Sequence, residues 1–130
     1  MKIAISSMGT DLDAQLDPRF GRCAYFIVVD TNDMSFEAFN NEGIASGGGA
    51  GIESARLVTS KGAKAVVSGN FGPNAVRALS AAGVEIYIAN TGTLREVIEK
   101  YKRGYLALMQ LANVPEYRGS VGGLKSLYPG

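Results

Sequence analysis

Short apolar runs and helical stripes alternate along the 130-residue chain. Runs rich in β-branched and aromatic residues favour strands, because such side chains fit a pleated and buried surface. Elsewhere apolar residues recur every three or four positions, which is typical of helices with one buried face. The runs predict five strands, at residues 2–7, 24–30, 34–39, 64–68 and 85–89.

Three helices are predicted between and after the later strands. Pro73 is expected in the first turn of the second helix, where its fixed φ angle fits and no N–H is needed. Thr93 and Glu96 form a capping box for the third helix, because each side chain can accept the other residue's backbone N–H. A further short helix is expected at 105–111. Glycines stand where the three main helices should end, at Gly62, Gly83 and Gly104.

The resulting order, β-β-β-α-β-α-β-α, predicts an α/β fold with a mixed five-stranded sheet between layers of helices. Right-handed crossovers would bring the loops at 6–22, 68–72 and 90–92 to one edge of the sheet. Ligands of open α/β sheets bind at that edge. We expect one domain at 1–112 and a loosely held tail at 113–130, where glycine and proline are frequent.

Charge and the rare residue types exclude several classes of function. The chain has 13 basic and 12 acidic residues, and the net charge of +1 provides no broad field for nucleic acid or a membrane surface. Because histidine is absent, Ser-His-Asp and Cys-His catalysis and histidine-based zinc sites are excluded. One cysteine allows no internal disulfide, and no apolar run suits a signal peptide or a membrane span, so we expect a cytoplasmic protein. No acid–base pair stands out, so a binding protein is expected rather than an enzyme.

Two glycine-containing loops could hold an anion. One of them lies at 68–74, where a strand turns into a helix and the turn contains Asn70 and Gly72. Backbone N–H groups at such a helix start can surround negative charge, but the same turns also occur as plain connections. The other loop lies at 46–51. It lacks the G-x-G-x-x-G spacing of dinucleotide sites, and the chain has no Gly-Lys pair for a P-loop. Its glycines precede the first predicted helix and are Gly47, Gly48, Gly49 and Gly51.

The polar loop after the first strand ends in a basic segment. Arg19 and Arg22 precede Cys23, and their charge is expected to lower the pKa of the thiol and favour a thiolate. Such a thiolate could supply one soft ligand to an iron–sulfur cluster, although a lone cysteine at a strand start is equally typical of a small buried side chain. Three aspartates of the loop lie off the strands, so we interpret them as solvated charges rather than as a two-metal nuclease centre: Asp11, Asp13 and Asp17.

Three segments of the chain resemble the dinitrogenase iron–molybdenum cofactor biosynthesis family, which includes NifX-like proteins and the C-terminal part of NifB. They read RFGRCAYFIVVD at 19–30, GGAGI at 48–52 and GNFGPNA at 69–75. The resemblance runs from Met1 to about Leu106 in the family's order and spacing. It implies a ribonuclease-H-like three-layer α/β/α fold. It also implies a carrier for iron–sulfur or iron–molybdenum cluster precursors, without catalytic turnover, in a role related to nitrogen fixation.

The cluster site implied by the resemblance combines basic side chains, backbone N–H groups and one sulfur. Many family members have histidines before the Phe-Gly-Arg triplet and before the first loop glycine, where this chain has Arg19 and Ser46. The expected partners are the metal–sulfur cluster and a cluster donor or acceptor protein, with no nucleic acid or membrane, and the chain is expected to be a monomer or weak homodimer. A small module for a phosphate-bearing ligand, or a protein-interaction domain, is the alternative. The candidate cluster-binding residues are Arg19, Arg22, Cys23, Ser46, Gly47, Gly48, Gly49, Gly51, Asn70 and Gly72, with Cys23 as the candidate metal ligand.

Overall fold

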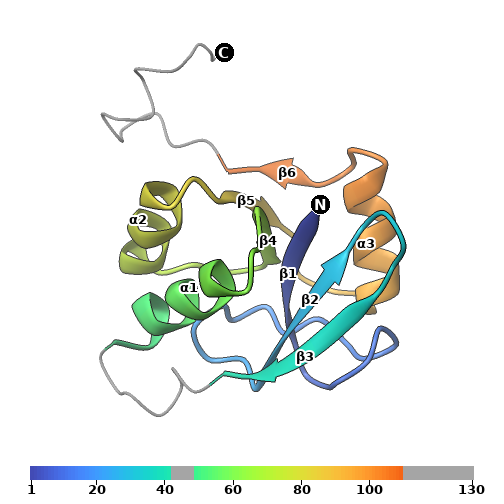
Figure 1. The fold of residues 1–130 in the computed structure, drawn as a ribbon, viewed down its shortest axis with the longest axis horizontal. Helices are drawn as coiled ribbons and strands as arrows, with labels where there is room; N and C mark the ends of the chain where they lie inside the picture. Colours follow the sequence, from blue (N-terminus) through green and yellow to red (C-terminus); the bar gives the residue numbers. More distant parts are fainter. Residues whose placement is uncertain (42–48, 110–130) are drawn as a thin grey trace.

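The computed structural model describes residues 1–41 and 49–109, which form a mixed sheet with helices on both faces (Figure 1). The strands lie across the sheet in the order β3-β2-β1-β4-β5-β6. The β1–β4 and β4–β5 pairs are parallel, and the other three pairs are antiparallel. This arrangement confirms the predicted α/β class. The strands are β1 (Lys2–Ser7), β2 (Tyr25–Asp30), β3 (Phe36–Asn40), β4 (Ala65–Ser68), β5 (Glu85–Ile88) and β6 (Ala107–Leu108).

The residues predicted to mark the start of the third helix and the ends of all three helices take up those positions in the described part of the chain. In the capping box, Glu96 N donates to Thr93 Oγ1 at 3.2 Å and Thr93 N donates to Glu96 Oε1 at 2.9 Å. Gly62, Gly83 and Gly104 follow the helices with φ angles of 87°, 75° and 77°. None of these helices is long and apolar enough to cross a membrane. Their bounds are α1 (Ala50–Ser60), α2 (Pro73–Ala81) and α3 (Leu94–Lys102).

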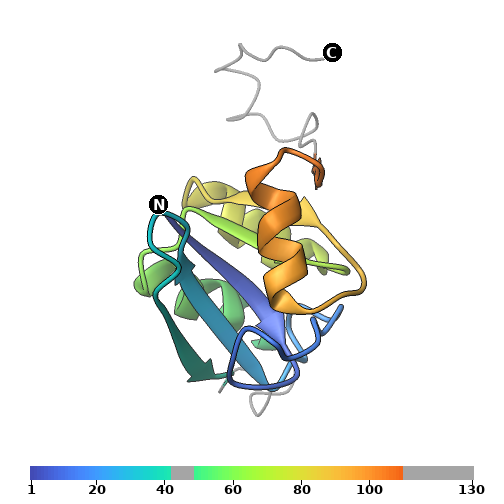
Figure 2. The same ribbon diagram turned by 90° about the vertical axis from the view of Figure 1, so that its right-hand side faces the viewer.

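The sheet separates two hydrophobic cores (Figures 1 and 2). Helices α1 and α2 cover one face, and α3 covers the other. Because side chains alternate along a strand, β1 contributes to both cores. Its Ala4 packs in the core with α1 and α2, and its Ile3 and Ile5 pack in the core with α3. The central strands are therefore buried on both sides, which explains their continuous apolar runs.

Beyond α3 the structure differs from the sequence prediction. The helix expected at 105–111 is wrong over its described residues, because Ala107 and Leu108 form β6 and pair antiparallel with Ile88 and Tyr87 of β5. The described sheet therefore has six strands instead of the predicted five. The predicted domain end at 112 and the tail at 113–130 lie outside the described residues. The ribonuclease-H-like class stays a prediction of the resemblance.

The loops that follow β1, β4 and β5 meet at one edge of the sheet, as predicted. Leu16 N of the first loop donates to Gly92 O of the third at 2.9 Å. Asn70 N of the second loop donates to Pro18 O of the first at 2.6 Å. These backbone hydrogen bonds hold the loops against one another, so a site at this edge is built from segments far apart in the sequence.

Candidate functional site

An open pocket lies where the basic loop approaches the starts of α1 and α2. Its volume is about 440 Å³. Its wall includes residues predicted for the cluster site, from both the basic loop and the helix starts: Arg19, Arg22, Gly51, Asn70 and Gly72. The other lining residues are Phe20, Gly21, Ala50, Phe71 and Ala75. The structure thus brings the two arginines to one place with Gly51 of the first predicted glycine segment and with the turn at Asn70 and Gly72.

Both helices at this pocket begin without a side-chain cap. The N-cap residue is Gly49 in α1 and Gly72 in α2, and neither has a side chain to accept the N–H groups of the first turn. Helix α3, away from the pocket, is capped by Thr93. Uncapped N–H groups and the helix dipole place partial positive charge at a helix start. The two starts therefore offer backbone donors to an anion.

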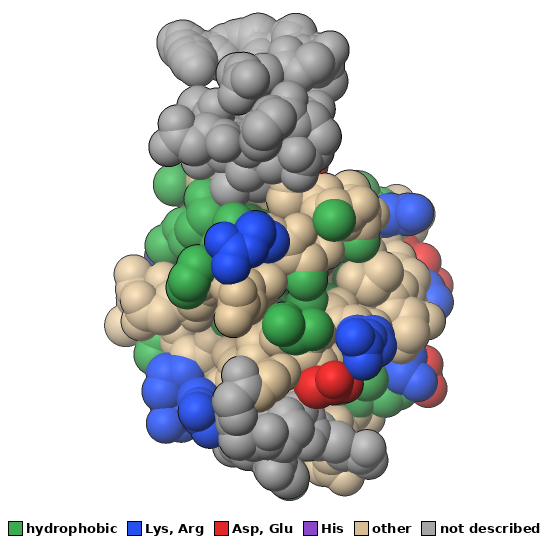
Figure 3. Space-filling model, turned by 90° about the vertical axis from the view of Figure 1, so that its left-hand side faces the viewer, with side chains coloured by type: hydrophobic (Ala, Val, Ile, Leu, Met, Phe, Trp, Pro, Cys, Tyr) green, Lys and Arg blue, Asp and Glu red, His purple; other side chains and the backbone are tan. Residues whose placement is uncertain are grey.

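Positive charge at the pocket is local. On the face that carries α1 and α2, Lys and Arg side chains form separate groups with hydrophobic side chains between them (Figure 3). Arg22 is exposed, and its guanidinium has no ion-pair partner among residues 1–41 and 49–109. An anion would therefore be attracted by a few defined groups rather than by a broad basic surface.

Arg19 is held in place by Asp17, which the sequence analysis interpreted as a solvated charge. That interpretation is wrong, because Asp17 is only 2% exposed. Its carboxylate accepts hydrogen bonds of 3.0 Å from Nε and Nη2 of Arg19, and a third of the same length from Arg19 N. Burial alone would raise the pKa of Asp17, but the hydrogen bonds and charge of Arg19 outweigh it and hold the pKa below the ordinary value of an aspartate. The pair fixes the direction of the Arg19 guanidinium.

The other two aspartates of the loop are solvated, as expected. Asp11 and Asp13 are exposed, and Asp13 Oδ1 accepts a hydrogen bond of 3.1 Å from Arg95 Nε. Nowhere in the described chain do three His, Cys, Asp or Glu side chains converge as metal ligands. A two-metal carboxylate centre is therefore absent from that part of the protein.

Buried hydroxyl groups tie the basic loop to the sheet. Ser6 Oγ of β1 lies 2.6 Å from Ser68 Oγ of β4 and 2.6 Å from Asp17 O. Phe20 N then donates to Asn70 O at 3.1 Å. These contacts fix the backbone on both sides of Arg19, so the pocket wall does not depend on the arginine side chain alone.

Gly69 lies so close to the basic loop that a side chain there would collide with it. A Cβ at Gly69 would lie 2.8 Å from Pro18 Cβ, whereas a Cβ at Gly72 would meet nothing within 4 Å. We expect Gly69→Ala to lower the free energy of unfolding by about 1–3 kcal/mol through overpacking. Gly72→Ala is expected to cost less than about 1 kcal/mol. Urea unfolding compares the two variants, and equal losses would contradict the close approach.

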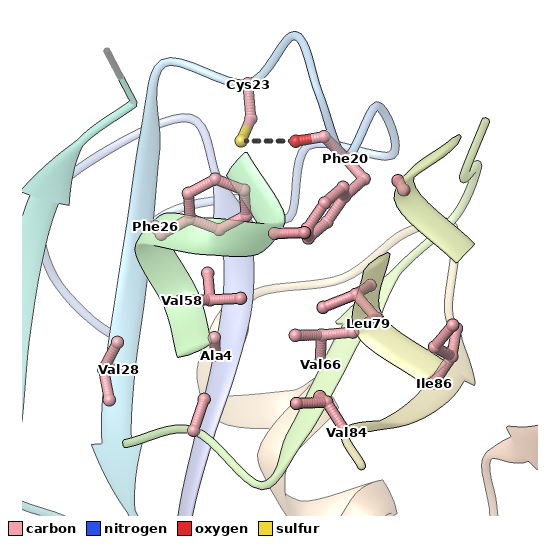
Figure 4. Packing of buried hydrophobic residues seen from close by; sticks show 13 residues of the cluster. Ala4, Phe20, Cys23, Phe26, Val28, Val58, Val66, Leu79, Val84 and Ile86 are labelled. Carbon is pink, nitrogen blue, oxygen red and sulfur yellow. Dashed lines mark hydrogen bonds between the residues drawn. The ribbon is translucent and has the colours of Figure 1, made fainter. Parts of the chain in front are cut away.

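Cys23 is sealed in the core beside α1 (Figure 4). Its exposed fraction is 0%, and its thiol donates to Phe20 O over an Sγ–O distance of 3.3 Å. Burial, with a smaller contribution from the charge of Asp17, raises the pKa of Cys23 to about 12. The predicted lowering of this pKa by the arginines is therefore wrong. The side chain is a protonated, buried thiol, and it is not in the pocket wall.

The raised pKa of Cys23 predicts a loss of stability in alkali. The thiol ionises near pH 9.0 in its ordinary state and near pH 12 in the folded protein, so folding favours the protonated form. This contribution is complete below about pH 9 and is lost as the pH rises toward 12, with a slope of up to about 1.4 kcal/mol per pH unit. Urea unfolding of the native chain and of Cys23→Ala across this range measures it. Parallel pH profiles for the two proteins would contradict the assignment.

The predicted glycine loop is only partly described. Ser46, Gly47 and Gly48 lie outside the described residues. Gly49 occupies the N-cap position of α1 and does not line the pocket. Gly51 lies in the first turn of α1 instead of the loop, and a Cβ there would lie 3.3 Å from Ala75 Cβ of α2. Its lack of a side chain therefore lets the two helix starts come together.

Sequence reasoning did not single out Asp17 or Phe71 as parts of the site. The spacing of Asp17, two residues before Arg19, was a signal for a local ion pair. Phe71 lines the pocket and stacks on Phe20, with ring centroids 4.9 Å apart. Its position between two glycines gives no sign of that contact, which joins loops separated by 50 residues of chain.

Known proteins resemble the chain along most of its length. An uncharacterised protein of Methanocaldococcus jannaschii is 29% identical over 110 residues, which cover 82% of this chain and 93% of that protein. The apo form of the orange protein from Desulfovibrio gigas is 35% identical, with a TM-score of 0.80 over 83% of this chain and 92% of its own.

A NifB-like protein of known structure and a family model also match most of the chain. A putative NifB protein from Thermotoga is 36% identical, with a TM-score of 0.73 over 82% of this chain and 91% of its own. Residues 1–104 match the family model described as dinitrogenase iron-molybdenum cofactor, in agreement with the resemblance of the three motif segments. The chain therefore belongs to the dinitrogenase iron–molybdenum cofactor family.

Proposed function

We propose that this protein binds and carries an anionic iron–sulfur or iron–molybdenum cluster precursor, without catalysing a reaction on it. The observation that carries the proposal is the pocket at which two uncapped helix starts meet Arg19 and Arg22. Guanidinium groups and backbone N–H groups are the donors that suit the sulfides of such an anion. Membership of the family and the NifB-like relative support this choice of cargo over other anions.

The cargo would be held by charge and hydrogen bonds rather than by bonds from protein atoms to metal. The chain has no histidine, and its one thiol is buried and protonated. The described pocket wall contains no carboxylate or thiolate. A suitable cargo therefore has its metals already covered by its own sulfides. Such binding should be reversible and should weaken with salt, which fits a carrier that receives a precursor from one protein and delivers it to another.

Anaerobic incubation with ferrous iron and sulfide, or with tetrathiomolybdate, tests the proposal. After gel filtration we expect metal and sulfide to elute with the protein, with visible absorbance, at low salt. Cys23→Ala is expected to retain both, because the thiol lies outside the pocket. Protein that elutes without metal under all these conditions would contradict the proposal. Strong thermal stabilisation by phosphate or a nucleotide, with none by thiomolybdate, would favour the alternative of a phosphate-bearing ligand.

A further inference from the structure

The outer edge of β3 is open in the described structure. β3 ends the sheet and pairs with β2 alone (Figure 1). At the two ends of the β2–β3 ladder, Asp30 N donates to Ser35 O at 2.8 Å and Asn41 N donates to Ala24 O at 3.0 Å. Hydrogen-bonded pairs alternate along an antiparallel ladder, so the odd-numbered residues of β3 direct their N–H and C=O groups to β2. The even-numbered residues Phe36, Ala38 and Asn40 therefore direct theirs outward.

We propose that β3 pairs antiparallel with β3 of a second copy of this chain, about a two-fold axis through Ala38. In that register Ala38 forms a hydrogen-bonded pair with Ala38 of the second copy, and Phe36 forms one with Asn40. All the outward N–H and C=O groups of the strand are then paired, which removes two open sheet edges at once. The small Ala38 side chain allows the two strands to meet at the axis.

Charge complementarity selects this register. Glu37 would face Phe39 of the second copy as a pair without direct hydrogen bonds, the kind in which opposed side chains lie closest. The ammonium group of Lys61 lies over the Phe39 ring in a cation–π contact, with Nζ 4.5 Å from the ring centroid. Glu37 and Lys61 line the same small cavity on the α1 side of the sheet. Neither forms a salt bridge with any described residue.

The two-fold axis repeats this contact. Glu37 of each copy reaches the Lys61 of the other, so the register that pairs the backbone also pairs two sets of opposite charges. Phe36, which is 40% exposed in the single chain, is partly covered by the neighbouring strand. The area is small for a permanent complex, so the dimer is expected to be weak and to depend on concentration.

Sedimentation of the native chain from about 10 µM to about 1 mM tests the proposal. We expect a dimer that grows with concentration, and an Ala38→Pro variant that stays monomeric. The proline removes an outward N–H and leaves the β2–β3 ladder intact. Ala38→Ser keeps that N–H and is the matched control, expected to dimerise like the native chain. A native chain that is monomeric throughout, or an Ala38→Pro dimer as strong as the native one, would overturn the proposal.

A charge exchange tests the register independently, even if Ala38→Pro fails to fold. Glu37→Lys and Lys61→Glu are each expected to weaken dimerisation about tenfold at low salt, because each turns both attractive pairs into repulsive ones. The double variant restores opposite charges and is expected to recover most of the loss. Single variants that dimerise like the native chain, or a double variant no better than the singles, would show that this pairing is wrong.

Discussion

Replacing Phe20 by alanine is expected to lower the free energy of unfolding by about 3–5 kcal/mol. Phe20 is 1% exposed, and it is the residue through which the basic loop enters the core of α1 and α2. Its ring lies 5.1 Å from that of Phe26 and 4.9 Å from that of Phe71, measured between centroids. Deleting it leaves a cavity under three segments of chain. Because a domain has only about 5–15 kcal/mol of stability, this is a large share.

Phe36→Ala provides the matched control for this loss. It removes the same atoms from a side chain that is 40% exposed on the edge strand β3. The expected cost is about 1 kcal/mol or less. Urea unfolding of both variants at low protein concentration gives the comparison. Similar costs for the two variants would mean that the loop is not anchored through Phe20.

Replacing Arg22 by alanine is expected to weaken thiomolybdate binding about 10- to 100-fold. That range corresponds to the roughly 1.5–3 kcal/mol of a hydrogen bond to a charged group. Arg22 lines the pocket and has no ion-pair partner in the described part of the chain, so its full charge is available to an anion. Arg19 already faces the carboxylate of Asp17. Because the Arg22 side chain is exposed, the Arg22→Ala variant is expected to have nearly the same free energy of unfolding as the native chain.

Arg103→Ala is the control for a general change in charge. Arg103 is exposed after α3, on the opposite face of the sheet, where it pairs with Glu99 over 3.0 Å. The variant lowers the net charge by the same amount, but its binding of thiomolybdate is expected to stay within about twofold of the native value, because distant surface charges are screened. Equal losses for Arg22→Ala and Arg103→Ala would indicate unspecific attraction instead of a site.

Local chemistry allowed much of the fold to be predicted. The capping box at Thr93 and the glycines after each helix act through their own neighbours, so their effect is visible in a short stretch of sequence. The convergence of the three loops at one edge follows from the handedness of the crossovers. β6 was missed because two residues are too few to show a period of two, and its pairing with β5 comes from distant chain.

The candidate site was predicted less completely because burial decides its chemistry. Arg19, Arg22 and the start of α2 were brought together as expected. Cys23 follows the same arginines in sequence, but burial in the core that also contains Phe26 and Val58 removes it from water and raises its pKa. Asp17 is buried by contacts with β1 and β4. Neither burial can be read from neighbouring residues, since both depend on segments far along the chain.

The central claim is that a metal–sulfide anion binds at the paired starts of α1 and α2. Tetrathiomolybdate is diamagnetic, so titrating it into isotope-labelled protein and following the backbone amide signals by NMR tests this claim most directly. We predict saturable shifts concentrated at Arg22, Gly51, Asn74 and Ala75. In the Arg22→Ala variant the shifts of the other three residues should need about 10- to 100-fold more tetrathiomolybdate to saturate. Shifts centred elsewhere, for example beside Tyr87 and Tyr101 on the other face, or no saturable shifts at all, would contradict the account.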